Sequence, residues 1–181
     1  MKPVTLLLVA ANVLAYLLEL GAGGQAVCGA YGLIPAHFVP GALVTSMFLH
    51  DSSSLAHIAG NMVFLAFFGA IAEEALGGGL FLALYLASGA AGGLLHIAVN
   101  PHDVAPLVGA SGAIFGVMAV AGAVRPRLMG FVVAFGAVNV WHAIVGGGGD
   151  VSFACHIGGI CAGFVATLVL RVVGSEALEA A

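Results

Sequence analysis

Gly109-Ala110-Ser111-Gly112-Ala113-Ile114-Phe115-Gly116 opens the apolar segment 111–124. The length of this segment determines how deep Ser111 would lie in a lipid bilayer. As a helix, a segment of about 14 residues rises about 21 Å, which is less than the hydrocarbon core of a bilayer, about 30 Å. If the segment reaches the interface at Arg125, then Ser111 lies below the opposite surface. Polar groups at that depth cost free energy and therefore tend to mark function. The stretch predicts a serine in a wet cavity, reached by a descending loop over 104–110.

The composition places this cavity in a membrane protein. The chain is 62% hydrophobic and 7% charged, whereas soluble domains carry about 25% charged residues. With 4 basic residues, the chain lacks the electrostatic footprint of a nucleic-acid-binding protein. The 3 cysteines show neither a disulfide framework nor metal-ligand spacing, and no His-Glu-x-x-His motif is present. We expect contact with the lipid bilayer, no nucleic acid, no metal and no cofactor.

Six apolar segments are long enough, or nearly so, to cross a bilayer as helices. The first follows Lys2, but it has no convincing signal-peptide cleavage site and five further apolar segments come after it. The sequence therefore predicts an all-α, polytopic bundle of six transmembrane helices that forms a single domain over 1–181. We place these helices at 4–20, 55–72, 80–99, 111–124, 128–145 and 153–173.

The basic residues predict the orientation of these helices. Lys2, Arg125, Arg127 and Arg171 all fall on one side of a six-span topology, and positive charge is concentrated on the cytoplasmic side. We therefore expect cytoplasmic N- and C-termini. Residues 21–54 then form an outer loop, too apolar for a free linker, which should pack against the bundle or dip into the membrane interface.

Four polar residues fall at a similar depth near the outer face, although they are far apart in sequence. Ser111 and His156 have the chemistry of a nucleophile and its base. His57 and Asn61 share one helical face and donate hydrogen bonds, as an oxyanion hole requires. Two structural alternatives stay open: Ser111 as a helix N-cap, and His57 with Asn61 as hydrogen bonds between helices.

Pairs of glycines predict which helices touch. Gly112 and Gly116 on one helix, and Gly159 and Gly163 on another, are each spaced i, i+4. Such grooves let helix backbones approach closely, and that contact would bring His156 toward Ser111.

We predict a serine–histidine dyad, since no acidic residue of the spans is placed to orient His156. Asp103 and Asp150 are expected to be solvated in outer loops. His50 is expected to hydrogen-bond the outer loop, whereas His96 and His142 could be satisfied inside the bundle. No role is assigned to His37 or His102, both expected in loops.

Taken together, the order and spacing of these motifs resemble the rhomboid family of intramembrane serine proteases, in its minimal six-helix bacterial form. The resemblance extends over about residues 31–170. It rests on Thr45-Ser46-Met47-Phe48-Leu49-His50, His57-x-x-x-Asn61-Met62, the 109–116 stretch, and His156-x-x-Gly159-x-x-x-Gly163.

The resemblance implies a role for each motif. Ser111 would be the nucleophile and His156 the general base, while His57, Asn61 and the backbone N–H of Ser111 would stabilise the oxyanion. The substrates would be transmembrane segments of membrane proteins, cut near the outer face of a bacterial plasma membrane.

Further residues are implied to support the site. Phe115 matches an aromatic position that packs on the catalytic histidine, and Glu73 matches a glutamate that helps to tether the outer loop. The chain departs from the family at Gly41-Ala42, where a Trp-Arg pair is frequent, so the outer loop must be anchored differently. Cys155 replaces a common alanine. The flanking glycines of the motifs, Gly109, Gly112, Gly159 and Gly163, complete the predicted site.

The rival hypothesis is a membrane protein without catalytic activity, either a transporter or a pseudoprotease that binds client helices. An inverted repeat would favour a transporter, and none is found. A pseudoprotease would lack Ser111 or His156, and both are present.

Overall fold

The computed structural model describes residues 2–145 and 152–179, in which the chain forms eight α-helices and one 3₁₀ turn. Asp150, which we expected in an outer loop, lies outside this part of the chain. The helices are α1 (Pro3–Gly21), α2 (Gln25–Tyr31), α3 (Ala42–Thr45), α4 (Leu55–Leu76), α5 (Gly78–Val99), α6 (Ser111–Val124), α7 (Pro126–Val145) and α8 (Phe153–Glu179), and the 3₁₀ turn η1 is Pro35–His37.

Each of the six predicted apolar segments forms a helix. Helix α6 has the predicted bounds, whereas α4 and α8 extend four and six residues beyond their predicted ends. Within the described ranges, α1, α4, α5 and α8 are long and apolar enough to cross a membrane, and α6 is a shorter apolar helix. The protein is therefore a multi-pass membrane protein. Helix α7 is not among those four. Its crossing of the membrane stays a prediction.

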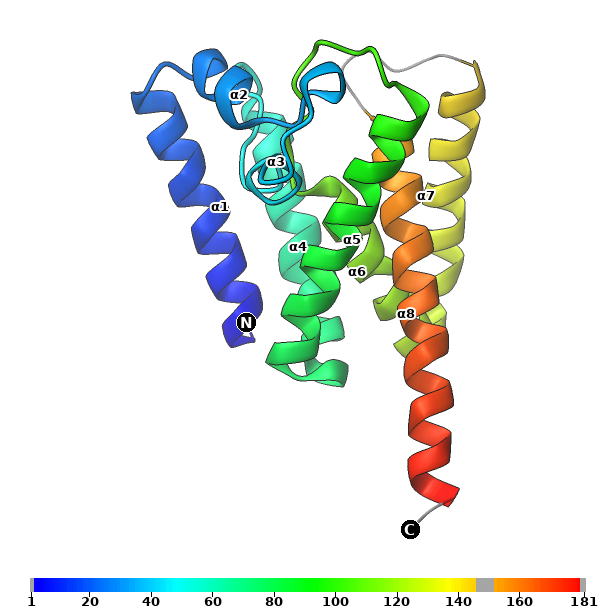
Figure 1. The fold of residues 1–181 in the computed structure, drawn as a ribbon. Coiled ribbons are helices and arrows are strands. Elements are labelled where there is room, and N and C mark those ends of the chain that lie inside the picture. Colours follow the sequence, from blue (N-terminus) through cyan, green and yellow to red (C-terminus); the bar gives the residue numbers. More distant parts are fainter. Residues whose placement is uncertain (1, 146–151, 180–181) are drawn as a thin grey trace.

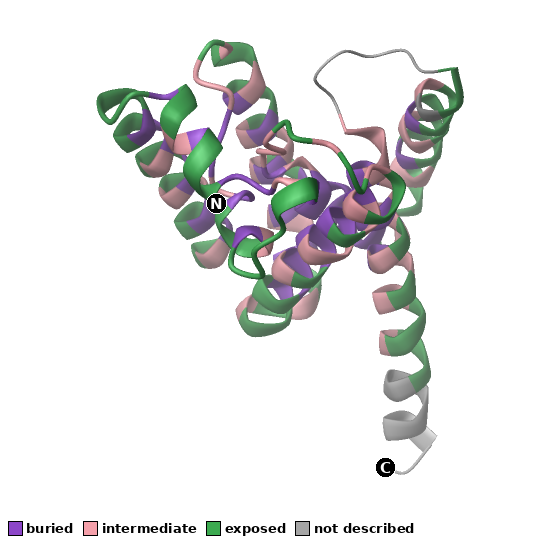
Figure 2. Cartoon of the chain, turned by 45° about the horizontal axis from the view of Figure 1, so that its top comes forward, coloured by how far each residue is buried: buried purple, intermediate pink, exposed green. Residues whose placement is uncertain are grey.

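Helix α6 occupies the centre of the bundle. It contacts α4, α5, α7 and α8, and every residue from Gly112 to Gly122 is buried. Figure 2 shows burial concentrated around this centre and exposure along the far part of α8. Helix α1 begins and α8 ends at the same end of the bundle (Figure 1). We call this the basic end, because Lys2, Arg125 and Arg127 lie there.

The outer-loop segment, residues 21–54, packs on the opposite end of the bundle, as expected. Leu33 is fully buried and pairs with Leu107 through two backbone hydrogen bonds of 3.0 and 2.9 Å. Met47 joins the core cluster around α6. The loop that follows α5 descends beside this segment, so α6 begins below the level at which α5 ends (Figure 1). Ser111 consequently lies beneath the surface formed by the outer-loop segment.

Glu73 does not tether the outer-loop segment, contrary to the expectation from the resemblance. It accepts hydrogen bonds from the backbone N–H groups of Val4 (2.9 Å) and Thr5 (2.7 Å), and from the Thr5 hydroxyl (2.7 Å). Helix α4 runs toward the basic end, so Glu73 meets the start of α1, where N–H groups lack partners within the helix. A carboxylate is stabilised there by the helix dipole.

A different buried carboxylate, Glu19 at the end of α1, holds the outer-loop segment. Glu19 accepts the backbone N–H of His50 at 3.1 Å and the thiol of Cys28 at 3.0 Å. Burial, together with the hydrogen bond to Glu19, raises the pKa of Cys28 to about 12, so the thiol stays protonated and donates. This cluster anchors the outer-loop segment to the end of α1.

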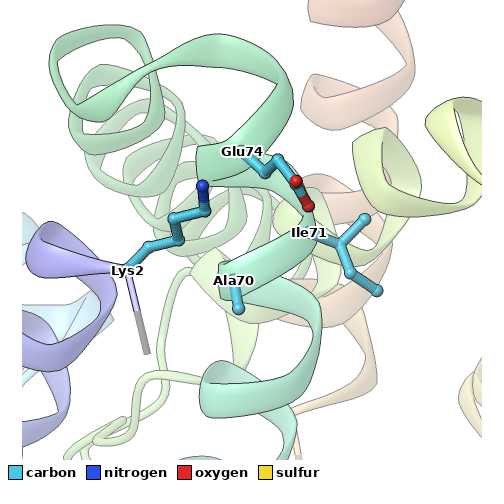
Figure 3. Close-up of a pocket in the computed structure, with 4 residues that line it drawn as sticks. All are labelled: Lys2, Ala70, Ile71 and Glu74. Carbon is cyan, nitrogen blue, oxygen red and sulfur yellow. The ribbon is translucent and has the colours of Figure 1, made fainter.

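A pocket of about 340 Å³ opens at the basic end, lined by Lys2, Ala70, Ile71 and Glu74 (Figure 3). The Arg125 guanidinium lies 3.6 Å from the Glu74 carboxylate, and both side chains are more than half exposed. Ion pairs this exposed contribute little to stability. The pocket lies at the opposite end of α6 from Ser111.

Candidate active site

Ser111 is the first residue of α6, and its side chain does not cap the helix. Ala110 occupies the N-cap position, without a side-chain hydrogen bond. The first backbone bond of the helix runs from the Ile114 N–H to the Ala110 carbonyl (3.0 Å). The N–H of Ser111 therefore has no acceptor within the helix, and the serine hydroxyl is free for another partner.

That partner is His156, which lies one turn into α8. The Nε2 atom of His156 is 2.8 Å from the Ser111 hydroxyl, and its Nδ1 atom is 2.6 Å from Oδ1 of Asn139 on α7. The imidazole stacks on Phe115, with ring centroids 4.3 Å apart and planes at 11°, as the resemblance implied. Phe135 stacks on the far side of Phe115 at 5.3 Å. Three helices thus contribute to the position of one buried imidazole.

The predicted contact between glycine grooves brings α6 and α8 together. A Cβ atom on Gly159 would collide with the backbone oxygen of Gly112, and one on Gly163 with the backbone oxygen of Gly116. Only glycine permits this approach. The contact of α6 with α8 carries His156 to the start of α6, although 45 residues separate the serine from the histidine.

His57 faces the same point from α4. A Cβ atom on Gly109 would lie 2.9 Å from His57 Nε2 and 3.9 Å from the Ser111 hydroxyl. Gly109 also has φ +123°, a conformation that favours glycine. The backbone N–H of Asp51 donates to Nδ1 of His57 at 3.3 Å, which leaves Nε2 as the protonated atom, directed toward Gly109 and Ser111.

Asn61 is buried one turn along α4, and its amide has a local partner. Its Nδ2 donates to the backbone carbonyl of His57 at 2.9 Å. The structure therefore does not bring this donor to Ser111, and a role for Asn61 at the oxyanion stays a prediction.

His50 is fully buried, and neither of its ring nitrogens has a hydrogen-bond partner within the described chain. His50 does hydrogen-bond the outer loop, but through its backbone carbonyl, which accepts the Cys28 thiol at 3.6 Å, while its backbone N–H donates to Glu19. The His50 ring packs edge-on against His57, with centroids 5.2 Å apart. Burial, and secondarily the nearby His57, lower the pKa of His50 to about 4. The ring is therefore neutral at physiological pH.

The remaining histidines lie away from Ser111. His96 is buried inside the bundle and contacts the Ser152 hydroxyl at 2.8 Å. His142 contacts the Val138 carbonyl at 2.8 Å. His37 and His102 are exposed. Across the described ranges, no group of three or more His, Cys, Asp or Glu side chains could hold a metal ion.

Asn139 is the residue that the sequence reasoning missed. A partner of His156 was expected only among acidic residues, and Asn139 is neutral. Its signal was nevertheless present, because it is a strongly polar side chain inside the apolar segment 128–145, where polar groups tend to be functional. A neutral amide can accept a hydrogen bond as a carboxylate does.

The chain matches known proteins over most of its length. Residues 37–172 match the Rhomboid domain family. Over 135 residues the chain is 33% identical to rhomboid protease GluP of Bacillus subtilis, an alignment that covers 71% of this chain and 25% of that protein. The match thus spans about a quarter of the relative's length. Because the domain match covers well over half of this chain, the chain belongs to the rhomboid family.

Proposed function

We propose that the protein is an intramembrane serine endopeptidase, which cleaves transmembrane segments of membrane proteins with a dyad of Ser111 and His156. The observation that supports this most directly is the 2.8 Å contact between the Ser111 hydroxyl and His156 Nε2. This contact supports the assignment of Ser111 as the nucleophile and His156 as its base, because such a pair must lie within hydrogen-bonding reach. The serine also stands at a helix start, where an N–H group is available.

In the proposed reaction, His156 Nε2 takes the hydroxyl proton as Ser111 Oγ attacks the carbonyl carbon of the scissile peptide. The tetrahedral intermediate collapses when His156 returns the proton to the departing amine, which leaves an acyl-enzyme on Ser111. Water then attacks the ester, with His156 again as the base, and releases the carboxylate product together with the free serine. Each proton moves through one imidazole nitrogen, so the dyad needs no cofactor.

The oxyanion would be stabilised by the backbone N–H of Ser111 and by Nε2–H of His57. The closeness of His57 Nε2 to Gly109 and Ser111 supports this assignment. Asn61 would be a third donor if its amide turned away from the His57 carbonyl when substrate binds. Donors aimed at the developing charge act strongly in a site of low dielectric.

The proposed orientation places the termini in the cytoplasm and the start of α6 toward the outer face. It rests on the basic residues Lys2, Arg125 and Arg127 at one end of the bundle. Single cysteines, introduced beside Arg127 or at exposed Val104 in a cysteine-free background, should react with an impermeant maleimide only at Val104. Labelling beside Arg127 from outside would reverse the topology.

A fluorophosphonate probe tests the chemistry directly. We expect covalent attachment to Ser111, identified by mass spectrometry, and loss of labelling in Ser111→Ala and in His156→Ala. The matched control is Ser152→Ala, since Ser152 also contacts a histidine at 2.8 Å; this variant should label normally. Cleavage of a transmembrane substrate in proteoliposomes should follow the same pattern. A folded wild-type protein that neither labels nor cleaves would favour the non-catalytic alternative, a transporter or a pseudoprotease.

A further inference from the structure

We propose that Asn139 is a positioning residue, which selects the tautomer of His156 and holds its imidazole plane toward Ser111. This inference rests on the proposed function, since it assigns a supporting group to the same base. Asn139 lies on α7, its side chain is buried, and its Oδ1 atom is 2.6 Å from His156 Nδ1.

The orientation of the Asn139 amide follows from a second hydrogen bond. Its Nδ2 donates to the backbone carbonyl of Phe135 at 2.7 Å. If the amide were flipped, its oxygen would face the Phe135 carbonyl and two acceptors would meet. The network therefore directs the amide oxygen, an acceptor only, toward the imidazole.

The amide oxygen in turn determines which imidazole nitrogen carries the proton. A neutral histidine has one N–H donor and one acceptor nitrogen. With an acceptor at Nδ1, the proton resides on Nδ1, and the lone pair of Nε2 faces the Ser111 hydroxyl. In the opposite tautomer, Nε2–H would point at Ser111 and could not accept its proton. Where a serine protease is given a partner that favours the wrong tautomer, kcat falls by about 10⁴.

Packing does not enclose the imidazole completely, because His156 lines a cavity, although Phe153 lies edge-on to its ring with centroids 6.2 Å apart. A cavity of about 340 Å³ lies between α7 and α8, and its lining is apolar apart from Asn139 and His156. Phe115 covers one face of the imidazole. Without the Asn139 hydrogen bond, the ring would have room on the cavity side to turn. The orientation of the base therefore depends on the placement of α7.

Three variants separate positioning from simple packing. Asn139→Leu removes the acceptor and keeps a similar volume. Asn139→Asp retains an acceptor for His156 in either protonation state; when protonated, the carboxyl also keeps a donor for the Phe135 carbonyl. Asn12→Leu is the matched control, because Asn12 is a buried asparagine on α1 with the same type of bond, from Nδ2 to the Leu8 carbonyl at 2.8 Å.

With a transmembrane substrate in proteoliposomes, Asn139→Leu should lower kcat at least about tenfold with little change in KM. Asn139→Asp and Asn12→Leu should stay close to the wild-type kcat. A wild-type kcat in Asn139→Leu would overturn the proposal, as would an Asn139→Asp variant that is folded and equally impaired.

The ¹⁵N NMR spectrum of protein with labelled histidines reports the tautomer of His156 and does not depend on catalytic activity. His156 signals, assigned by their loss in His156→Gln, should report Nδ1–H in the wild type and a shift toward Nε2–H in Asn139→Leu. Wild-type protein with Nε2–H would overturn the positioning role even if it is active. If, instead, the tautomer is as proposed but Ser111 does not react with a fluorophosphonate, only the proteolytic function fails.

Discussion

Two serine–histidine pairs lie toward the outer-loop end of this molecule, and the distance from hydroxyl oxygen to ring nitrogen is the same in both. Ser111 and His156 are 2.8 Å apart, and so are Ser152 and His96. The first pair joins α6 to α8, and the second joins the end of α5 to the start of α8. The distance alone therefore does not distinguish a candidate dyad from a structural contact.

The surroundings of the two pairs differ. The Ser152 hydroxyl also accepts the Cys155 N–H at 3.2 Å, so it caps the first turn of α8. His96 meets Ser152 through Nδ1, which is also 3.2 Å from the Asn100 amide nitrogen. At the first pair, by contrast, the serine does not cap its helix, and the other ring nitrogen has a dedicated acceptor. A serine becomes a plausible nucleophile when its hydroxyl has no structural task and its histidine has a fixed tautomer.

Removing the two histidines in turn gives the largest expected contrast. His156→Ala should abolish cleavage, since residual rates without the base are lower by orders of magnitude. His96→Ala should lower thermal stability but leave kcat near the wild-type value. Measuring kcat and melting temperature for both variants shows whether each histidine serves catalysis or stability. Equal losses of activity would show that both pairs serve the chemistry.

The oxyanion assignment gives the next largest effect. His57→Ala should lower kcat about a hundredfold, or about 3 kcal/mol, with a smaller change in KM. Asn61→Ala should have a weaker effect, because its amide is bound to the His57 carbonyl. A near-normal kcat with a reduced melting temperature would assign His57 to packing between helices.

The glycine contact that creates the first pair can be tested with two alanine substitutions. Gly159→Ala pushes a Cβ atom into the backbone oxygen of Gly112, whereas Gly136→Ala on α7 meets only the tip of Ile160, at 3.2 Å. Overpacking against backbone should cost about 1–3 kcal/mol, and the contact at Ile160 can relax. Denaturation in mild detergent should therefore show a loss in Gly159→Ala alone. Equal stability of the two variants would contradict the close approach of α6 and α8.

Acidification should lower the stability of the folded protein through His50, whose ring packs on His57 near the first pair. Burial lowers the pKa of His50 from 6.5 to about 4, so the unfolded chain binds a proton first as the pH falls. This contribution to stability is present above about pH 6.5 and is lost as the pH falls toward about 4. From pH 8 to pH 5 the expected loss is about 2 kcal/mol.

This loss can be measured by recording the melting temperature as a function of pH. The His50→Leu variant, which lacks the titrating ring, is compared with the wild type. We expect a shallower pH dependence in His50→Leu over the same range. An unchanged slope would mean that His50 is not the group that titrates.

The smallest effect is expected at the second pair itself. Ser152→Ala removes the hydrogen bond to His96 and the cap of α8, and it should cost about 1–2 kcal/mol of stability, with kcat unchanged. Thermal melting of this variant, compared with wild type in one detergent, is a sufficient measurement. A large fall in kcat would instead extend the active site toward α5.

The approximate positions of the long helices, though not every end, could be predicted from the sequence because they depend on local properties. The length of an apolar run and the residues that interrupt it determine where a membrane helix begins and ends. Segment 111–124 was placed to the residue, and the short length of α6 already implied a serine below the surface. The spacing of Gly159 and Gly163 likewise indicated which face of α8 could approach another helix.

Only the tertiary structure decided which side chains meet, because rotation and tilt of helices depend on packing between them. Glu73 was assigned to the outer loop from the resemblance, yet the direction of α4 takes it to the start of α1, and Glu19 holds the outer-loop segment instead. Asn139 is 17 residues from His156 on a different helix. Its amide faces the imidazole through the packing of α7 against α6 and α8, which no local pattern records.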